Sequence, residues 1–79
     1  MTEVKVVLNT VDKVKRFEEE VTKFVCDCDL VSGNYVIDAK SLLGIFSLDL
    51  SKPLILRIHE NHADISSLKE WTISDPVQM

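Results

Sequence analysis

The sequence has no apolar run near the ~18 residues of a membrane-spanning helix, and it has no excess of basic side chains. Its 79 residues include 13 acidic and 9 basic ones, for a formal net charge of −4. A surface of that sign repels phosphate backbones and anionic lipids. The first residues, Met1 to Lys5, also lack the basic and apolar regions of a secretion signal. We therefore expect a cytoplasmic protein with neither nucleic acid nor membrane as a partner.

The composition is that of an ordinary globular domain, with 46% hydrophobic and 28% charged residues. No repeat, linker or low-complexity stretch divides the chain. We expect a single domain over residues 1–79, and the sequence leaves open whether the tail after about residue 72 is ordered.

Changes in the spacing of apolar residues divide the chain into seven elements. The expected elements, in order, are a strand over 4–8, a helix of about four turns over 11–24, a hairpin of two strands over 26–37 that turns at 32–34, a short helix over 42–48, a strand over 54–58 and a last short helix over 65–71. Ser41 and Asp64 are placed to cap the second and third helices. This order predicts a two-layer α+β fold, in which a four-stranded antiparallel sheet is covered on one face by three helices.

The segment Asp38 to Leu48, Asp-Ala-Lys-Ser-Leu-Leu-Gly-Ile-Phe-Ser-Leu, resembles the regulatory-serine segment of HPr. HPr is the phosphocarrier protein of the bacterial sugar phosphotransferase system, and the resemblance is to the form found in low-GC Gram-positive bacteria. The match extends without gaps from about Phe17 to Leu68, about two thirds of the chain. The family has an open-faced β-sandwich of βαββαβα order, which agrees with the order expected from periodicity.

The resemblance places Thr10 where the family has its active-site histidine and Asp12 where it has a neighbouring arginine. Threonine has no ring nitrogen that could carry a phosphoryl group, and aspartate repels one. The connection before the first helix is also shorter than the family loop. We therefore expect a non-functional position at Thr10, no catalytic residue, no enzyme activity and no cofactor. In lacking the histidine but keeping the serine, the chain is similar to Crh, a paralogue of HPr.

The resemblance also implies a regulatory phosphorylation site at Ser41, because a dedicated kinase modifies the matching serine in the family. A phosphate at a helix N-cap meets free backbone N–H groups, so the modification need not unfold the helix. The alternative is that Ser41 is only an N-cap, worth about 1 kcal/mol. Both interpretations remain open from the sequence.

In the family, the residues matching Leu42, Leu43 and Phe46 form an exposed hydrophobic patch that docks partners, and the other apolar residues of this helix turn inward. Exposed apolar side chains are unfavourable for solubility unless something covers them. We expect a partner-binding surface at these three residues and the adjacent Lys40. The alternative is that all the apolar residues of this helix belong to the core. Asp49 stands where the family often has a glycine, which puts the end of the helix in question.

Two histidines and two cysteines are the other candidates for chemistry. His59 and His62 lie near the end of the last strand, and alternation directs His59 to solvent, so we favour exposed turn histidines over a phosphoacceptor or a metal site.

Cys26 and Cys28 are separated by one residue, which is not the C-x-x-C spacing of redox and zinc sites. We expect both thiols in the core, with no disulfide and no metal.

Three functions are compatible with the sequence. The first is a non-catalytic HPr-like regulatory or adaptor protein that binds a kinase, a transcription regulator or a metabolic enzyme through the helix starting at Ser41. The second is a phosphocarrier with an atypical acceptor. The third is an assembly or homo-oligomer domain, whose apolar helix and sheet face are covered by a copy of itself or by a larger protein.

Overall fold

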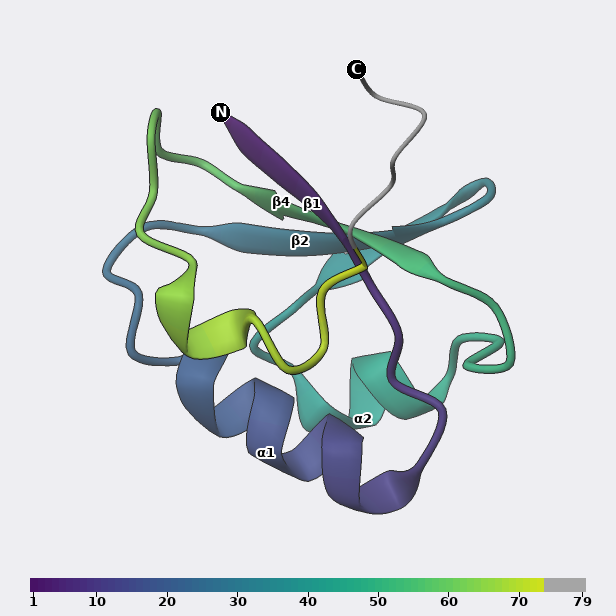
Figure 1. Ribbon diagram of the computed structural model, residues 1–79. Helices are drawn as coiled ribbons and strands as arrows, with labels where there is room; N and C mark the ends of the chain where they lie inside the picture. Colours follow the sequence, from purple (N-terminus) through teal and green to yellow (C-terminus); the bar gives the residue numbers. More distant parts are fainter. Residues whose placement is uncertain (74–79) are drawn as a thin grey trace.

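The computed structural model describes residues 1–73, and it shows a four-stranded antiparallel sheet with helices on one face (Figure 1). The strands are β1 (Thr2–Val6), β2 (Cys28–Ser32), β3 (Tyr35–Asp38) and β4 (Leu54–Ile58), and their order across the sheet is β1-β4-β2-β3. The helical elements are α1 (Val11–Val21), α2 (Leu42–Phe46) and a single 3-10 turn, η1 (Ser66–Leu68). Residues 74–79, on which the prediction for the tail falls, lie outside the described part of the chain.

Alternation along the strands directs one set of apolar side chains toward the helices. In β4, the side chains of Leu54, Leu56 and Ile58 are fully buried, as the sequence predicts. Across the core, the ring of Phe17 on α1 meets the ring of Trp71 edge to face, with centroids 5.8 Å apart. Each fully buried side chain of this size stabilises the fold by about 1.5–3 kcal/mol. The core therefore lies between the sheet and the helices, and within residues 1–73 no helix covers the opposite face of the sheet.

Helix α1 is shorter than predicted, since it ends at Val21 and not near Phe24. The backbone beyond it tightens into bonds of the 3-10 type, in which Lys23 N donates to Glu20 O (3.2 Å) and Phe24 N to Val21 O (3.1 Å). The hydroxyl of Thr22 also donates to Glu19 O. Phe24 still packs against the core, so the apolar spacing continues where the α-helix has stopped.

The first strand also differs from the expectation, because it ends at Val6 and not near Leu8. Val6 lies opposite Leu54, and the next residue on that neighbouring strand would be Pro53, which has no N–H to donate to a ladder. The N–H of Val7 donates to Trp71 O instead (2.9 Å). Leu8 is nevertheless fully buried.

The predicted third helix is only the 3-10 turn η1, so the third helix of the expected cover does not form as an α-helix. The side chain of Asp64 accepts from Ser66 N (3.0 Å), but the N-cap residue of the turn is Ile65. The chain cannot continue as a helix because it runs beside β1, where Thr72 forms a bridge with Val6 and Ile73 N donates to Lys5 O. Among residues 1–73, no helix has the length and apolar character needed to cross a membrane.

A candidate interaction surface on helix α2

Helix α2 begins at Ser41, as the sequence predicts. Ser41 has an extended backbone, and its Oγ accepts a hydrogen bond from the Gly44 N–H at 3.2 Å. Its own N–H donates to Asp38 O at 3.0 Å, which ties the start of the helix to the end of β3. The predicted N-cap is therefore confirmed, and the Ser41 hydroxyl is already used as an acceptor within the helix.

The predicted docking residues Leu42, Leu43 and Phe46, which we call the α2 patch, differ in exposure. Leu43 is 84% exposed and Phe46 is 38% exposed, whereas Leu42 is half-buried against the core. Ile45, on the opposite side of the helix, is fully buried. The alternative that all the apolar residues of this helix belong to the core is wrong for Leu43 and Phe46.

Gly44 leaves space around the Ser41 hydroxyl. A Cβ at this position would lie 3.2 Å from Ser41 Oγ and 3.5 Å from Cδ1 of Ile37 on β3. A separation of 3.2 Å is tighter than an ordinary van der Waals contact, so a side chain here would crowd the hydroxyl. The glycine in this motif therefore has a local steric role, which the sequence alone did not reveal.

Lys40 has a structural role that the sequence analysis missed. Its Nζ donates to Phe24 O at 2.6 Å and to Cys26 O at 2.8 Å, so the ammonium group joins the start of α2 to the connection between α1 and β2. Its backbone N–H donates to the side chain of Asp38. These contacts bridge 14 and 16 residues of sequence, and no local pattern signals them. Partner binding by Lys40 stays a prediction.

Asp49 forms a compact turn after α2. Its Oδ1 accepts from the Ser51 hydroxyl at 2.5 Å and from the Ser51 N–H at 3.1 Å. These two bonds, that of the hydroxyl first, lower the pKa of the Asp49 carboxyl. In the described residues only Gly33 and His62 have a positive φ, so Asp49 does not adopt the left-handed conformation that a closing glycine would provide.

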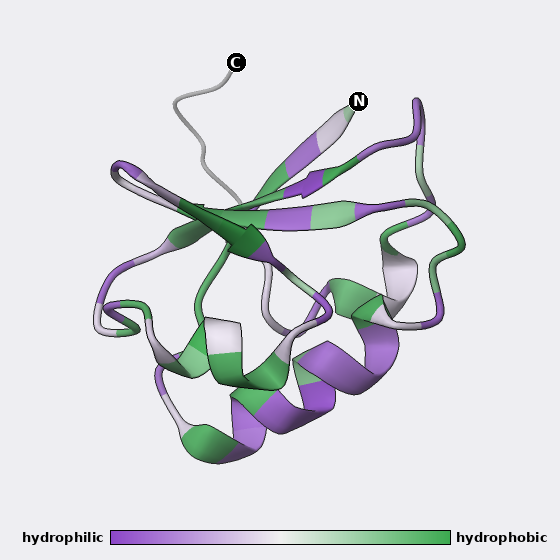
Figure 2. Ribbon diagram, turned by 180° about the vertical axis from the view of Figure 1, so that it is seen from behind, coloured by the Kyte–Doolittle hydropathy of each residue, from purple (hydrophilic) through white to green (hydrophobic). Residues whose placement is uncertain are grey.

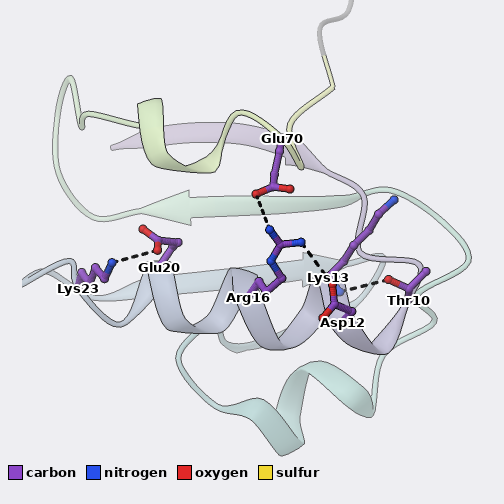
Figure 3. A network of polar contacts seen from close by, with 7 residues as sticks. All are labelled: Thr10, Asp12, Lys13, Arg16, Glu20, Lys23 and Glu70. Carbon is purple, nitrogen blue, oxygen red and sulfur yellow. Dashed lines mark hydrogen bonds and ion pairs between the residues drawn. The ribbon is translucent and has the colours of Figure 1, made fainter.

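The position that the resemblance assigns to the family's histidine is an ordinary helix cap (Figure 3). Thr10 Oγ1 accepts from the Lys13 N–H at 3.1 Å and begins α1. The guanidinium of Arg16 lies between two carboxylates, 3.3 Å from Asp12 and 3.7 Å from Glu70. Thr10 offers no ring nitrogen, and the guanidinium of Arg16 is already paired with carboxylates. The arrangement caps a helix and links it to the chain after η1.

Of the two histidines, His59 has a partner that the sequence analysis did not foresee. Its Nε2 lies 2.7 Å from Asp29 Oδ2 on β2, at an exposed position. The register explains the contact, since Asp29 pairs with Arg57 and His59 follows two residues later on the same face. His62 is exposed, in agreement with the prediction for both histidines.

The two cysteines differ from each other. Cys28 is buried, and burial above all, followed by the neighbouring Cys26, raises the pKa of its thiol to about 11. Cys26 is half-buried and free. The described residues contain no group of three or more histidine, cysteine, aspartate and glutamate side chains that could hold a metal ion. Because its pKa is raised, the Cys28 thiol is a poor nucleophile, and the side chain behaves as a small apolar core residue.

The sheet order and the placement of the helices define an open-faced α+β sandwich. No protein-family model matches the chain, and no curated protein matches it. Among solved structures, the chain is similar to the crystal structure of HPr-C-His from Thermoanaerobacter tengcongensis, with a TM-score of 0.69 and 24% sequence identity. The similarity covers 87% of this chain and 84% of that one. The chain therefore has the HPr-like fold, and at this identity the likeness shows the fold alone.

Proposed function

We propose that this chain is a non-catalytic HPr-like regulatory or adaptor protein that binds another protein through α2, and that phosphorylation of Ser41 controls the binding. The observation that carries the proposal is the 84% exposure of Leu43, with Phe46 beside it on the helix that Ser41 caps. Such exposure is unfavourable in water, and a partner that covers the α2 patch would remove it. A kinase, a transcription regulator or a metabolic enzyme fits the role of partner.

The surroundings of Ser41 support a role as a switch. A phosphate adds about −1.5 to −2 charges, and here the charge would lie at the start of the helix that exposes Leu43. The absence of a side chain at Gly44 leaves space next to the Ser41 hydroxyl. Phosphorylation would therefore change the surface that a partner meets while the helix stays folded.

The region around Thr10 supports a protein without phosphocarrier activity. Thr10 is occupied as a cap, and the carboxylates of Asp12 and Glu70 flank Arg16. In this respect the chain is similar to Crh, in which the histidine is also missing. Incubation with phosphoenolpyruvate and the general phosphotransferase enzyme is expected to leave no acid-labile phosphate on the protein. A phosphohistidine at His59 or His62 would overturn the non-catalytic part of the proposal.

The switch is tested by incubating the purified chain with ATP and the HPr kinase and measuring its intact mass. We expect one phosphate, located at Ser41 by peptide mapping and lost in Ser41→Ala. Thr10→Ala is the matched control, because it also removes a capping hydroxyl and should be labelled like the wild type. Absence of labelling in the wild type would remove the switch and favour an assembly role.

Leu43→Ser tests the docking surface without removing a core residue. Sedimentation of the wild type and of this variant separates binding to a foreign partner from self-association. We expect the wild type to sediment as a monomer. A wild-type oligomer that Leu43→Ser dissolves would show that the α2 patch is covered by a second copy of the chain.

A further inference from the structure

Strand β3 is the outer strand of the sheet on one side, and in the described part of the chain nothing pairs with its far edge. The opposite edge of the sheet, formed by β1, has backbone partners. There the chain from Trp71 to Ile73 runs along the outer side of β1 near its end. Ile73 N donates to Lys5 O, and Val7 N, just after the strand, donates to Trp71 O, both at 2.9 Å. Within residues 1–73, the fold therefore pairs the end of one edge of its sheet, from Lys5 to Val7, and leaves the other edge unpaired.

The register shows which backbone groups of β3 point outward. Ala39 N donates to Cys28 O at 2.9 Å, and alternate residues of an antiparallel strand bond to the same neighbour. Tyr35 and Ile37 thus direct their backbone groups to β2, whereas Val36 and Asp38 direct theirs away from it. The outward carbonyl of Asp38 already accepts from Ser41 N. As far as the chain is described, the N–H and C=O of Val36 and the N–H of Asp38 remain available to another strand.

The side chains of β3 are also exposed in a way that edge strands usually avoid. Tyr35 is 71% exposed and Val36 is 56% exposed. Figure 2 shows the hydrophobic stretch of this strand in front of the rest of the sheet. Natural edge strands are commonly protected by lysine, proline or a bulge, and the sequence Tyr-Val-Ile-Asp contains neither lysine nor proline. The short length of β3 limits non-specific pairing but leaves room for a specific one.

A groove runs along the helix side of β3, between the hairpin and the chain that follows α2. It has a volume of about 620 Å³, and Tyr35, Ile37 and Leu48 supply its apolar walls. Tyr35 and Ile37 are alternate residues of β3, so they face the same side of the sheet. A strand added to this edge would direct every second side chain into the groove, which is how β-strand addition selects its ligands.

The end of β3 is acidic. Asp38 lies opposite Asp29 on β2, and these two residues line a small pocket of about 210 Å³ together with Asp27 and His59. The ammonium group of Lys40, two residues after Asp38, is committed to two backbone carbonyls. This corner therefore favours a cationic side chain on whatever lies beside it.

We propose that β3 binds an extended segment of a partner protein as a fifth strand. Alternate apolar side chains of that segment occupy the groove, and a lysine or arginine lies beside Asp38. A second copy of this chain fits less well, because Tyr35–Asp38 has no basic residue to offer and each chain has a net charge of −4. This site is separate from the α2 patch and does not depend on phosphorylation of Ser41.

The test uses ¹⁵N-labelled protein and two synthetic peptides of alternating valine and threonine, one ending in lysine and the other in glutamate. We expect the lysine peptide to shift the amide signals of β3 and of Leu48, and the glutamate peptide to bind about tenfold more weakly. Peptide shifts confined to α2, equal binding of both peptides, or no shift at saturating peptide would each overturn the proposal. Self-association through β3, abolished by a variant of that strand, would assign the edge to a second copy.

Two variants locate the contact. Val36→Pro removes the outward N–H, a change that an edge strand tolerates, and should abolish peptide binding while the amide spectrum stays dispersed. Asp38→Asn keeps an oxygen to accept from Lys40 N but removes the charge, and should weaken the lysine peptide about threefold. Glu19→Gln, which removes an exposed carboxylate from α1, is the matched control and should bind like the wild type. If Asp38→Asn and Glu19→Gln bind equally well, the acidic corner has no part in recognition.

Discussion

Helices α1 and α2 both begin at a hydroxyl cap, but they differ in the side chains that they turn to solvent. α1 buries Val14, Phe17 and Val21 and exposes mostly charged residues, with one apolar side chain, Val11, 59% exposed in its first turn. α2 buries Ile45 and exposes Leu43. Beyond Val11, α1 has the pattern of an ordinary surface helix, whereas Leu43 is exposed within the apolar helix α2. The proposed function assigns this exposed apolar surface of α2 to the binding of a partner.

The largest effect that separates the two sides of α2 is expected from truncating its apolar residues one at a time. Ile45→Ala should lower the free energy of unfolding by about 2–4 kcal/mol, because it removes a fully buried side chain and leaves a cavity. Leu43→Ala should change it by less than about 0.5 kcal/mol, since its side chain is already in water. Urea denaturation followed by circular dichroism measures both. Equal losses would place Leu43 in the core and remove the basis for a docking surface.

Both helices begin at a hydroxyl N-cap, and removing either cap should lower the stability by a smaller amount. Thr10→Ala and Ser41→Ala should each lower the free energy of unfolding by about 1 kcal/mol, because each leaves a first-turn N–H without its acceptor. Thr10→Ser and Ser41→Asp keep an acceptor oxygen and should retain most of the stability. The same denaturation experiment reports all four variants. A loss at Ser41 far above that at Thr10 would mean that the Ser41 hydroxyl does more than cap the helix, since the backbone bond from Ser41 N to Asp38 O is kept in Ser41→Ala.

The comparison also shows which features a sequence can predict. The starts of both helices were predictable because a capping side chain acts within three residues of itself. The burial of alternate residues in β4 was predictable for the same local reason. The end of α1 was not, since the apolar spacing continues to Phe24 after the backbone has left the α-helix.

Contacts between distant parts of the chain account for what could not be predicted. The last helix was expected from apolar spacing, but the chain near Trp71 bonds to β1, more than sixty residues away in sequence. The contacts of Lys40 with the carbonyls of Phe24 and Cys26 span 16 and 14 residues, which is also beyond the reach of a local pattern. In the candidate site, the resemblance in sequence predicted Ser41 and the residues of the α2 patch. Only the fold shows the space at Gly44 and decides that Leu43 is exposed and not part of the core.

The charged surface of α1 should contribute as little to the free energy of unfolding as the exposed side chain of Leu43 on α2. Arg16 is 55% exposed and pairs with Asp12 at 3.3 Å and with Glu70 at 3.7 Å. Arg16→Gln should lower the free energy of unfolding by about 0.5 kcal/mol or less, because exposed pairs of this kind are weak. The difference from wild type should shrink further in 1 M salt, where charges are screened within about 3 Å. A salt-independent loss would mean that the stem of Arg16 packs against the chain near Glu70.

The ends of the two helices should differ in their response to acid. α1 ends at the hydroxyl of Thr22, which does not titrate, whereas α2 is followed by the turn in which the pKa of Asp49 is lowered by the Ser51 hydroxyl and N–H. A carboxyl whose pKa is lower in the folded than in the unfolded chain stabilises the fold above its unfolded pKa, near 3.8, and this contribution is lost as the pH falls through the folded value. Asp49→Asn keeps the acceptor oxygen but no longer titrates, so its stability should fall less steeply than that of the wild type below pH 3.8. Urea midpoints measured at a series of acid pH values would show the difference, together with faster exchange of the Ser51 N–H in the wild type alone. Parallel curves for the two proteins would mean that the turn after α2 is equally formed with the Asp49 carboxyl charged or neutral.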